Sequence, residues 1–216
     1  MKVGTQMVSI DKRLNANEMH LLRQMIGRKI VSFLHDAFLK DIYSSFGVLG
    51  IETEQKIIYL YSQTEVLDYF GAPEDVAVWE LTDERYPLAD SANFLSTPIN
   101  QTVKAIRLVQ ENQRLYQEGQ QTYDVWVTRG IIFDFGDFQF SLEKTYWIQE
   151  IIHMKKGKDL NEVLSTYAGT DDFVSGWTDE PSDDPSKDPV GECDREIVLL
   201  GEALLPEISP QNRMDH

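Results

Sequence analysis

Apolar and polar residues alternate most clearly between positions 125 and 142, with the period of two that is typical of a half-buried β-strand. Gly136-Asp137 divides this pattern, and a two-residue loop that begins with glycine suits a tight hairpin turn. With that turn, apolar residues of the two strands face one another in three pairs: Phe135 with Phe138, Phe133 with Phe140, and Ile131 with Leu142. All six side chains then share one face, so the pattern predicts a hairpin in which register and burial agree.

Further strands are expected on both sides of this hairpin. Val103–Gln110 should precede it, and Trp147–Met154 should follow it as a third strand. An earlier set of strands is predicted at Ile30–His35, Phe46–Glu52, Lys56–Tyr61 and Val76–Leu81. Residues 64–70 fit a helix or a strand equally well. Residues 87–100 contain two prolines and several small polar residues, so they are expected to connect the two sets of strands.

Two short helices are predicted from their start and stop signals. Asn15 followed by Glu18 is a variant of the capping box, and the apolar residues after it recur at helical spacing until Gly27 supplies a stop. Asp159 and Glu162 repeat this device, and Gly169 supplies the second stop. Both helices are short, so each needs tertiary packing to persist.

Together these elements predict an α+β fold that is predominantly antiparallel β, with residues 1–169 as a globular body. Its possible halves, 1–86 and 101–169, each contain a meander-like set of strands. At an offset of 80 positions (123 − 43), apolar and glycine positions of the two halves align, as Gly50 does with Gly130. A weak internal repeat is one interpretation, and the alternation that any two strand hairpins share is the other.

The composition changes sharply near the C-terminus. Residues 170–192 are rich in aspartate and proline, which favours an extended acidic segment. Residues 193–208 regain apolar character and are expected to pack on the body as an ordered segment, with a loose tail at 209–216. The formal net charge is −16, and residues 170–216 carry −10 of it (3 Lys/Arg against 13 Asp/Glu).

A field of this sign repels nucleic acid and anionic lipid, while it attracts basic proteins. The acidic segment therefore predicts a basic protein partner, and no nucleic acid or membrane as one. The residues expected to contact it are Asp171, Asp172, Asp179, Asp183, Asp184 and Asp188. The alternative is that the charge only keeps the protein soluble.

The compartment is expected to be the cytoplasm. The first residues lack the apolar run of a secretory signal, and no stretch approaches the roughly 18 apolar residues of a membrane-spanning helix. Cys193 is the single cysteine, which excludes an internal disulfide and fits a reducing compartment. Its acidic neighbours Glu192 and Asp194 should raise the pKa of the thiol, which argues against a nucleophilic cysteine.

Motifs of the large enzyme families are missing. The sequence holds no phosphate-binding loop, dinucleotide turn, zinc helix or nucleophile elbow, so no cofactor or metal is expected. None of the four histidines lies within four residues of another, and His35 and His153 are expected to be ordinary histidines on a sheet rim. The aspartate pairs lack the spacing of a calcium loop.

Two weaker sequence signals have simple structural interpretations. Glu54-Gln55-Lys56 echoes the Glu-x-Lys of metal-dependent nucleases, but three residues recur by chance and a solvated turn is the better interpretation. Six aromatic residues on predicted strands are Trp79, Trp126, Trp147, Tyr59, Tyr61 and Tyr123. They can form a binding platform on an open sheet, but filling the core is the more common use.

The sequence identifies no reaction. The function that fits best is a non-catalytic protein-binding module, of the immunity, antitoxin or regulatory kind, that uses an acidic surface to engage a basic partner. The alternative is an enzyme whose site is assembled from scattered carboxylates and one histidine, which leaves no local motif. A concave site with converging carboxylates and a histidine would favour the enzyme, and a flat acidic patch would favour the binding module.

Overall fold

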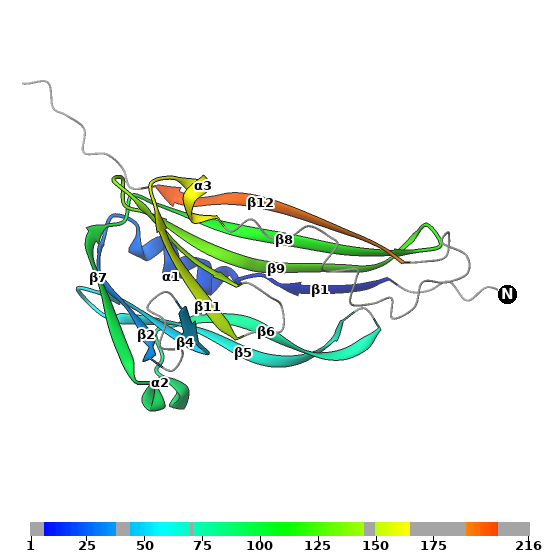
Figure 1. The fold of residues 1–216 in the computed structure, drawn as a ribbon, viewed down its shortest axis with the longest axis horizontal. Coiled ribbons are helices and arrows are strands. Elements are labelled where there is room, and N and C mark those ends of the chain that lie inside the picture. The colour runs from blue at the N-terminus through cyan, green and yellow to red at the C-terminus, as the bar shows by residue number, and fades with distance from the viewer. Residues whose placement is uncertain (1–6, 38–43, 70, 145–149, 165–188, 203–216) are drawn as a thin grey trace, which may run out of the picture.

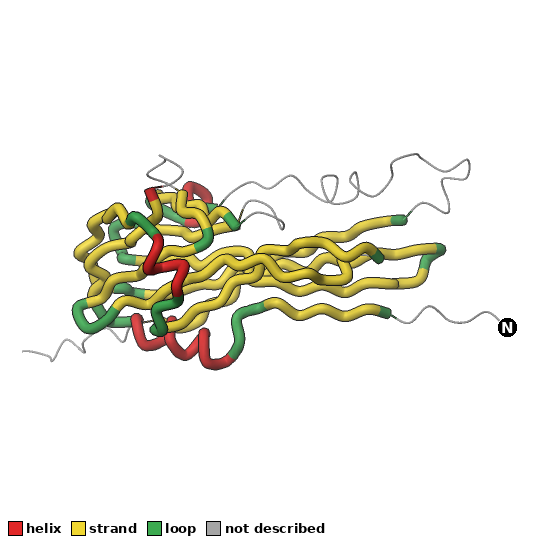
Figure 2. Tube along the Cα trace, turned by 90° about the horizontal axis from the view of Figure 1, so that it is seen from below, coloured by secondary structure: helices red, strands yellow, loops and turns green. Residues whose placement is uncertain are grey.

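The computed structural model describes residues 7–37, 44–69, 71–144, 150–164 and 189–202. Most of them lie in antiparallel strands of two sheets, and three short helices complete the described part of the chain. The predicted class, α+β with a predominance of antiparallel β, is therefore confirmed. Figure 1 shows the two sheets as two layers, and Figure 2 shows strands along the long axis with the helices gathered toward one end.

The larger sheet has seven strands in the order β12-β8-β9-β10-β11-β3, with β1 paired in parallel to β9. Its strands are β1 (Val8–Lys12), β3 (Ser44–Phe46), β8 (Ala105–Gln117), β9 (Gln120–Asp134), β10 (Gln139–Lys144), β11 (Ile151–Gly157) and β12 (Val190–Glu202). The strands β8 to β11 are consecutive in the chain and form an antiparallel meander. β12 and β3 lie at opposite edges of this sheet.

The smaller sheet has five strands in the order β6-β5-β4-β2-β7, all antiparallel. Its strands are β2 (Lys29–Asp36), β4 (Val48–Thr53), β5 (Ile57–Tyr69), β6 (Ala72–Thr82) and β7 (Phe94–Thr102). Residues 64–69, which the sequence pattern left open, belong to β5. The chain passes from the larger sheet to the smaller one at Gly47, whose φ of +71° suits glycine and divides the single strand predicted at Phe46–Glu52.

The main core fills the space between the sheets. Phe33 on β2 stacks on Phe140 of β10 with ring centroids 4.5 Å apart, and it meets Phe133 of β9 edge-on at 5.5 Å. Phe33 and Phe133 are fully buried, and Phe140 is 3% exposed. Aromatic pairs in these geometries stabilise a core beyond the area that they bury. The three rings therefore join the two sheets.

The predicted hairpin is confirmed in its register. β9 and β10 pair Phe133 with Phe140 and Ile131 with Leu142, as the alternation indicates. The Phe135 N–H donates to the Phe138 carbonyl over 3.0 Å across the turn, and Gly136 has a φ of +91°. The third strand also forms, as β11, but it runs from Ile151 to Gly157, whereas the prediction was Trp147–Met154. Residues 147–149 lie outside the described residues.

The first predicted helix is confirmed as α1 (Ala16–Met25). The Asn15 side chain accepts hydrogen bonds from the N–H groups of Asn17 and Glu18, and the Glu18 carboxylate accepts from the Asn15 N–H over 2.6 Å. The other oxygen of Glu18 accepts from the Leu81 N–H on β6 over 3.0 Å. One glutamate therefore both caps the helix and fixes it to the smaller sheet.

The second predicted helix is shorter than expected. α3 (Leu160–Val163) begins with Asp159 as its N-cap, but the backbone of Leu164 is extended and ends the helix there, before Gly169. The Glu162 carboxylate accepts from the Lys158 N–H over 2.7 Å. Among the described residues, no helix is long and apolar enough to cross a membrane.

The prediction that residues 87–100 are only a connector is wrong. They contain α2 (Pro87–Ser91) and most of β7. Pro87 occupies the first turn of α2, where a backbone N–H has no partner within the helix anyway. Pro98 lies on β7, opposite Ser32 of β2. β7 is an edge strand, and an edge strand tolerates a residue that cannot donate a backbone hydrogen bond.

The two predicted halves do not correspond to the two sheets. β1 and β3 come from the first half, yet both belong to the larger sheet. The internal repeat and the domain boundaries stay predictions. Strand β12 runs from Val190 to Glu202 along β8, so it spans the end of the predicted acidic segment and most of the predicted ordered segment.

Candidate functional site

The free edge of β12 is the candidate site with the most unusual surface. β12 pairs antiparallel with β8 from Val190 opposite Tyr116 to Glu202 opposite Ala105. It is the last strand of its sheet, and no described strand pairs with its other side. An edge strand presents a row of backbone N–H and C=O groups that another strand can pair with. The strand is thirteen residues long. Near its end the register with β8 shifts between Leu199 and Gly201, and the Leu200 carbonyl accepts a hydrogen bond from Nε of Arg23 on α1 over 3.4 Å, so the open part of the edge is Val190 to Leu199.

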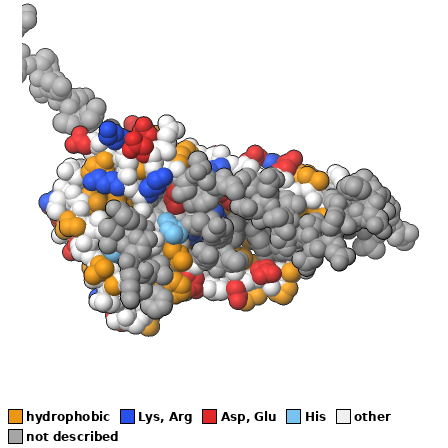
Figure 3. All heavy atoms as spheres, viewed as in Figure 1, with side chains coloured by type: hydrophobic (Ala, Val, Ile, Leu, Met, Phe, Trp, Pro, Cys, Tyr) orange, Lys and Arg blue, Asp and Glu red, His pale blue; other side chains and the backbone are white. Residues whose placement is uncertain are grey.

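The side chains of β12 are a mixture of exposed apolar ones and charged ones. Four apolar side chains on it are exposed: Val190 (60%), Ile197 (40%), Val198 (39%) and Leu199 (50%). The strand also carries the acids Glu192, Asp194, Glu196 and Glu202 against the single base Arg195. In Figure 3, acidic and apolar side chains lie together along the upper border, where β12 runs in Figure 1. The edge is therefore both acidic and apolar.

Two arginines attach β12 to the rest of the sheet. Arg114 on β8 forms ion pairs with Asp194 and, over 3.1 Å, with Glu192, whose side chains remain 71% and 51% exposed. Arg195 donates from Nη2 to Oε2 of Glu111 on β8 over 2.7 Å. Two carboxylates share one surface arginine, so this part of the strand keeps a net negative charge.

Glu111 is the centre of a buried polar cluster behind β12. Its side chain accepts hydrogen bonds from Arg195 and from Gln113 over 2.7 Å each, and Nε of Arg129 lies 3.8 Å away. Burial alone would raise the pKa of the Glu111 carboxyl, but Arg129, Arg195 and Gln113 together hold that pKa below its ordinary value. We call Glu111, Gln113, Arg129 and Arg195 the Glu111 cluster.

Cys193 lies on β12 opposite Gln113. Burial, with a smaller contribution from Glu111, raises the pKa of its thiol to about 11. The direction agrees with the sequence-based expectation, but the main cause is burial rather than the neighbouring acids Glu192 and Asp194. A thiol with this pKa stays protonated near neutral pH and is a poor nucleophile.

Lys144 at the end of β10 was not singled out by any sequence pattern. It is only 4% exposed, its ammonium group donates to the Ala77 carbonyl, and it lies 5.2 Å from the ring centroid of Trp79. Burial, with the nearby charge of Arg129, lowers the pKa of Lys144 to about 7. A lysine of this kind is partly neutral near pH 7, when it can act as a base or a nucleophile.

Lys144 should make the stability of the protein depend on pH. In the unfolded chain its pKa returns to the ordinary 10.5, so between pH 7 and 8.5 the unfolded chain binds more protons than the folded one. The free energy of unfolding should therefore rise with pH across this window. Replacing Lys144 by methionine should flatten the rise, as measured by urea unfolding at several pH values. The control is Lys155→Met, which removes an exposed lysine. If the free energy of unfolding has the same slope against pH in both variants, the burial of Lys144 does not cause the rise.

The three histidines within the described residues lie apart from one another. His35 is 1% exposed and lies on β2 of the smaller sheet, so its expected position on a sheet rim is wrong; β2 is an inner strand, with β4 and β7 on its two sides. His153 lies on β11 of the larger sheet, with Nδ1 3.0 Å from the Ser44 hydroxyl. His20 bonds to Gln24 on the exposed face of α1 over 2.8 Å. His216 lies outside the described residues.

The Glu54-Gln55-Lys56 sequence forms the turn between β4 and β5, as its interpretation as a solvated turn predicts. Lys56 pairs with Asp83 over 2.5 Å, and Glu54 lies 3.7 Å from the ammonium of Lys29. The three residues hold no shared ligand position. Their charges are neutralised by surface partners instead.

The aromatic residues on strands mostly fill the interior. Tyr59, Tyr61 and Trp79 are at most 4% exposed. Trp126 lies under the guanidinium of Arg13 at 4.7 Å, and the Tyr123 hydroxyl donates to Asp68 over 3.2 Å. Trp147 lies outside the described residues. Three of the other five are therefore buried, which is the more common use of aromatic residues on strands.

The six aspartates predicted to contact a partner all lie outside the described residues, so that prediction is neither confirmed nor contradicted. Within the described ranges, no group of three or more histidine, cysteine, aspartate or glutamate side chains is placed to hold a metal ion. The acidic edge that the structure does describe, on β12, was predicted only as part of an ordered segment. Comparison with protein-family models, curated proteins and solved structures gives no match to this chain.

Proposed function

We propose that this protein is a binding module that takes up a strand of a basic protein partner at the free edge of β12. The observation that carries the proposal is the combination of open backbone groups with exposed Ile197, Val198 and Leu199 on one edge strand. In strand addition, backbone hydrogen bonds supply affinity, and the side chains on both strands supply specificity. Proteins protect long edges against unwanted pairing with charges, bulges or coverings. The acids of β12 and the register shift between Leu199 and Gly201 disfavour pairing with most strands, and a basic strand is the kind that these acids attract.

The charge of the molecule indicates the chemistry of the partner. The chain has a net charge of −16, and β12 itself carries four acids against one base. Opposite charge raises the rate of association and favours a basic strand, whereas a second copy of this chain would bring like charges together. The acids near Glu192 should lie opposite lysines or arginines of the partner strand. Ile197 to Leu199 should lie opposite apolar residues of that strand.

An immunity, antitoxin or regulatory role is one form of this function, in which the bound strand belongs to a basic protein that is thereby restrained. The six aspartates between positions 171 and 188 add to the same negative field. The single cysteine suits a reducing compartment, and we propose the cytoplasm as the place of binding.

A designed peptide tests the proposal directly. The probe has an apolar amino-terminal half and a carboxy-terminal half in which lysine alternates with valine, so that antiparallel pairing places the lysines opposite Glu192–Glu196. We expect saturable binding by calorimetry that weakens as salt rises, because the Debye length falls from about 10 Å at 0.1 M to about 3 Å at 1 M. The same peptide with glutamate in place of lysine should not bind.

Neutralising the acids of β12 should weaken this binding. In a Glu192→Gln, Asp194→Asn, Glu196→Gln variant, we expect affinity for the lysine peptide to fall about tenfold at low salt, with a flatter salt dependence. A matched control neutralises three exposed acids near or on β6, which is also an edge strand, as Glu74→Gln, Asp75→Asn, Glu84→Gln. Equal losses in both variants would show that only the overall charge matters, and that β12 is not the binding edge.

An enzyme is the second candidate, and Lys144 is the observation that favours it. A buried lysine with a pKa of about 7 is a common feature of catalytic sites. Its neighbours Trp79 and Arg129 are also buried, and the described pocket is lined by other residues. The enzyme therefore has weaker support than the binding module.

A further inference from the structure

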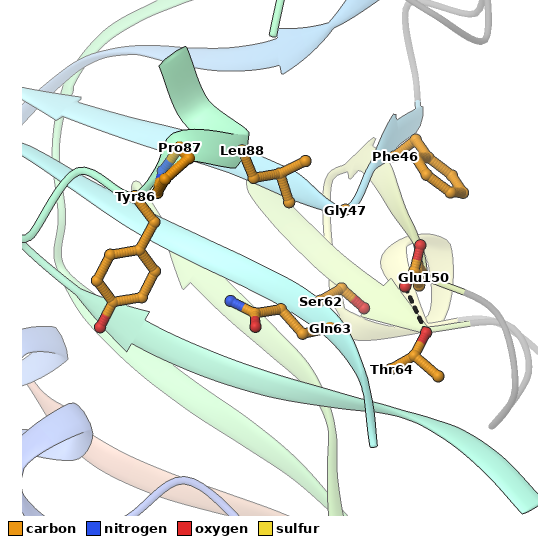
Figure 4. Close-up of a pocket in the computed structure, with 9 residues that line it drawn as sticks. All are labelled: Phe46, Gly47, Ser62, Gln63, Thr64, Tyr86, Pro87, Leu88 and Glu150. Carbon is orange, nitrogen blue, oxygen red and sulfur yellow. Dashed lines mark hydrogen bonds between the residues drawn. The ribbon is translucent and has the colours of Figure 1, made fainter. Parts of the chain in front are cut away.

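A pocket of about 530 Å³ opens where the two sheets meet, beside β3 and thus at the opposite edge of the larger sheet from β12 (Figure 4). We call it the seam pocket. Residues from both sheets and from α2 line it: Phe46, Gly47, Ser62, Gln63, Thr64, Tyr86, Pro87, Leu88 and Glu150. Its size falls within the range of pockets that hold small molecules, roughly 300–1,000 Å³.

The backbone around Gly47 gives this pocket a fixed shape. The Gly47 N–H donates to the Glu150 carbonyl over 3.1 Å, and the Gly47 carbonyl accepts from the Ser62 N–H over 2.8 Å. These bonds tie the strand crossover to both sheets. A side chain at Gly47 would meet Leu88, since a Cβ there would lie 3.1 Å from Cδ2 of that residue. Because glycine has no side chain, the space between Gly47 and Leu88 stays open.

The pocket contains a buried hydroxyl that lacks a partner. Ser62 is 1% exposed, and its Oγ has no hydrogen-bond partner among the described residues. Buried polar side chains in folded proteins nearly always have a partner, in the protein or in a bound molecule. Because Ser62 lines the pocket, a bound molecule with a hydrogen-bonding group would satisfy this hydroxyl.

The pocket also contains one carboxylate. The Thr64 hydroxyl donates to Oε1 of Glu150, which orients this group at the pocket wall, as the dashed line in Figure 4 shows. No described lysine or arginine forms an ion pair with Glu150. The remaining wall is largely apolar and includes Pro87, Leu88 and Phe46. Phe46 and Leu88 are 37% and 38% exposed. The hydroxyls of Thr64 and Tyr86, which also line the pocket, already donate to Glu150 and Glu80. The pocket thus combines one negative charge and one unpartnered hydroxyl with a largely apolar surface.

We propose that the seam pocket binds a small primary amine that carries an apolar arm. The ammonium group donates to the Glu150 carboxylate and to the Ser62 hydroxyl, which are both acceptors. The apolar arm packs on Leu88 and Phe46. A carboxylic acid of the same shape is repelled by Glu150, and a neutral alcohol loses the charge-assisted hydrogen bond.

Three compounds of one shape test the charge preference on the full-length protein. By calorimetry or ligand-observed NMR, phenethylamine should bind at least tenfold more tightly than phenethyl alcohol, since hydrogen bonds to charged groups are the stronger ones. The third compound, 3-phenylpropionate, should not bind measurably. Absent binding of phenethylamine, or equal binding of all three compounds, would overturn the proposal.

Two mild variants then locate the site. Glu150→Gln should weaken the binding of phenethylamine about tenfold and leave the binding of phenethyl alcohol unchanged. Ser62→Ala should weaken the binding of both ligands. The exposed Glu74→Gln is the matched control for loss of one negative charge, and circular dichroism confirms that each variant is folded. If Glu150→Gln and Glu74→Gln reduce amine binding equally, the amine responds to net charge alone and the seam pocket is not its site.

Discussion

Replacing Phe33 by alanine should lower the free energy of unfolding by about 3–5 kcal/mol, the usual cost of deleting a buried aromatic ring. Phe33 is fully buried and is in ring contact with Phe133 and Phe140 across the space between the sheets. Its loss leaves a cavity and removes both aromatic contacts at once. Urea unfolding followed by tryptophan fluorescence measures the effect.

Leu95→Ala is the matched control for this variant. Leu95 lies on β7 in the same sheet, but its side chain is 44% exposed, so its truncation should change stability by about 0.5 kcal/mol or less. Phe133→Ala should resemble Phe33→Ala, because the two rings pack against each other. A small effect of Phe33→Ala, similar to that of Leu95→Ala, would mean that the sheets do not pack through these rings.

Replacing Glu111 by glutamine should lower the free energy of unfolding by about 3 kcal/mol or more at pH 7, since breaking a buried ion pair leaves buried charge uncompensated. Glu111 is 3% exposed, and its carboxylate is shared by Arg129 and Arg195. The variant keeps the size of the side chain and removes only its charge. Urea unfolding of the wild-type protein and of the Glu111→Gln variant at pH 7 measures the difference in the free energy of unfolding.

The pH dependence of this difference provides a second readout. The pKa of the folded Glu111 is below its ordinary 4.5, so its stabilising contribution is complete above pH 4.5 and is lost as pH falls through the folded pKa. The gap between the two proteins should therefore narrow in acid. Glu65→Gln is the control, because the Glu65 side chain is 48% exposed and its ion pair with Lys12 should contribute at most about 1 kcal/mol. A gap that does not change in acid would contradict the proposed ion pairs.

The elements that sequence reasoning predicted well are those with local signals. The hairpin of β9 and β10 follows from alternation and a glycine turn, and α1 follows from Asn15 and Glu18, which act within one turn of helix. β7 was missed because the tolerance of Pro98 depends on its position at a sheet edge. That position is a property of the whole fold, and no local pattern indicates it.

The candidate sites were harder to predict for the same reason. The predicted strand at Val103–Gln110 stops where polar residues begin, yet β8 continues to Gln117, and its polar residues Glu111 and Gln113 are buried. Arg129 and Arg195 compensate Glu111 from strands that are distant in sequence. Lys144 likewise appears as an ordinary polar residue until the second sheet covers it.

Amide hydrogen exchange along β12, with and without the lysine peptide, is the most direct test of binding at this edge. Strand addition predicts that alternate amides between Val190 and Leu199, those whose N–H groups point away from β8, exchange much more slowly in the complex. The amides of β6 at the edge of the smaller sheet should not change. Protection that appears at β6 or at the seam pocket, with exchange along β12 unaltered while the peptide is bound, would contradict the proposal.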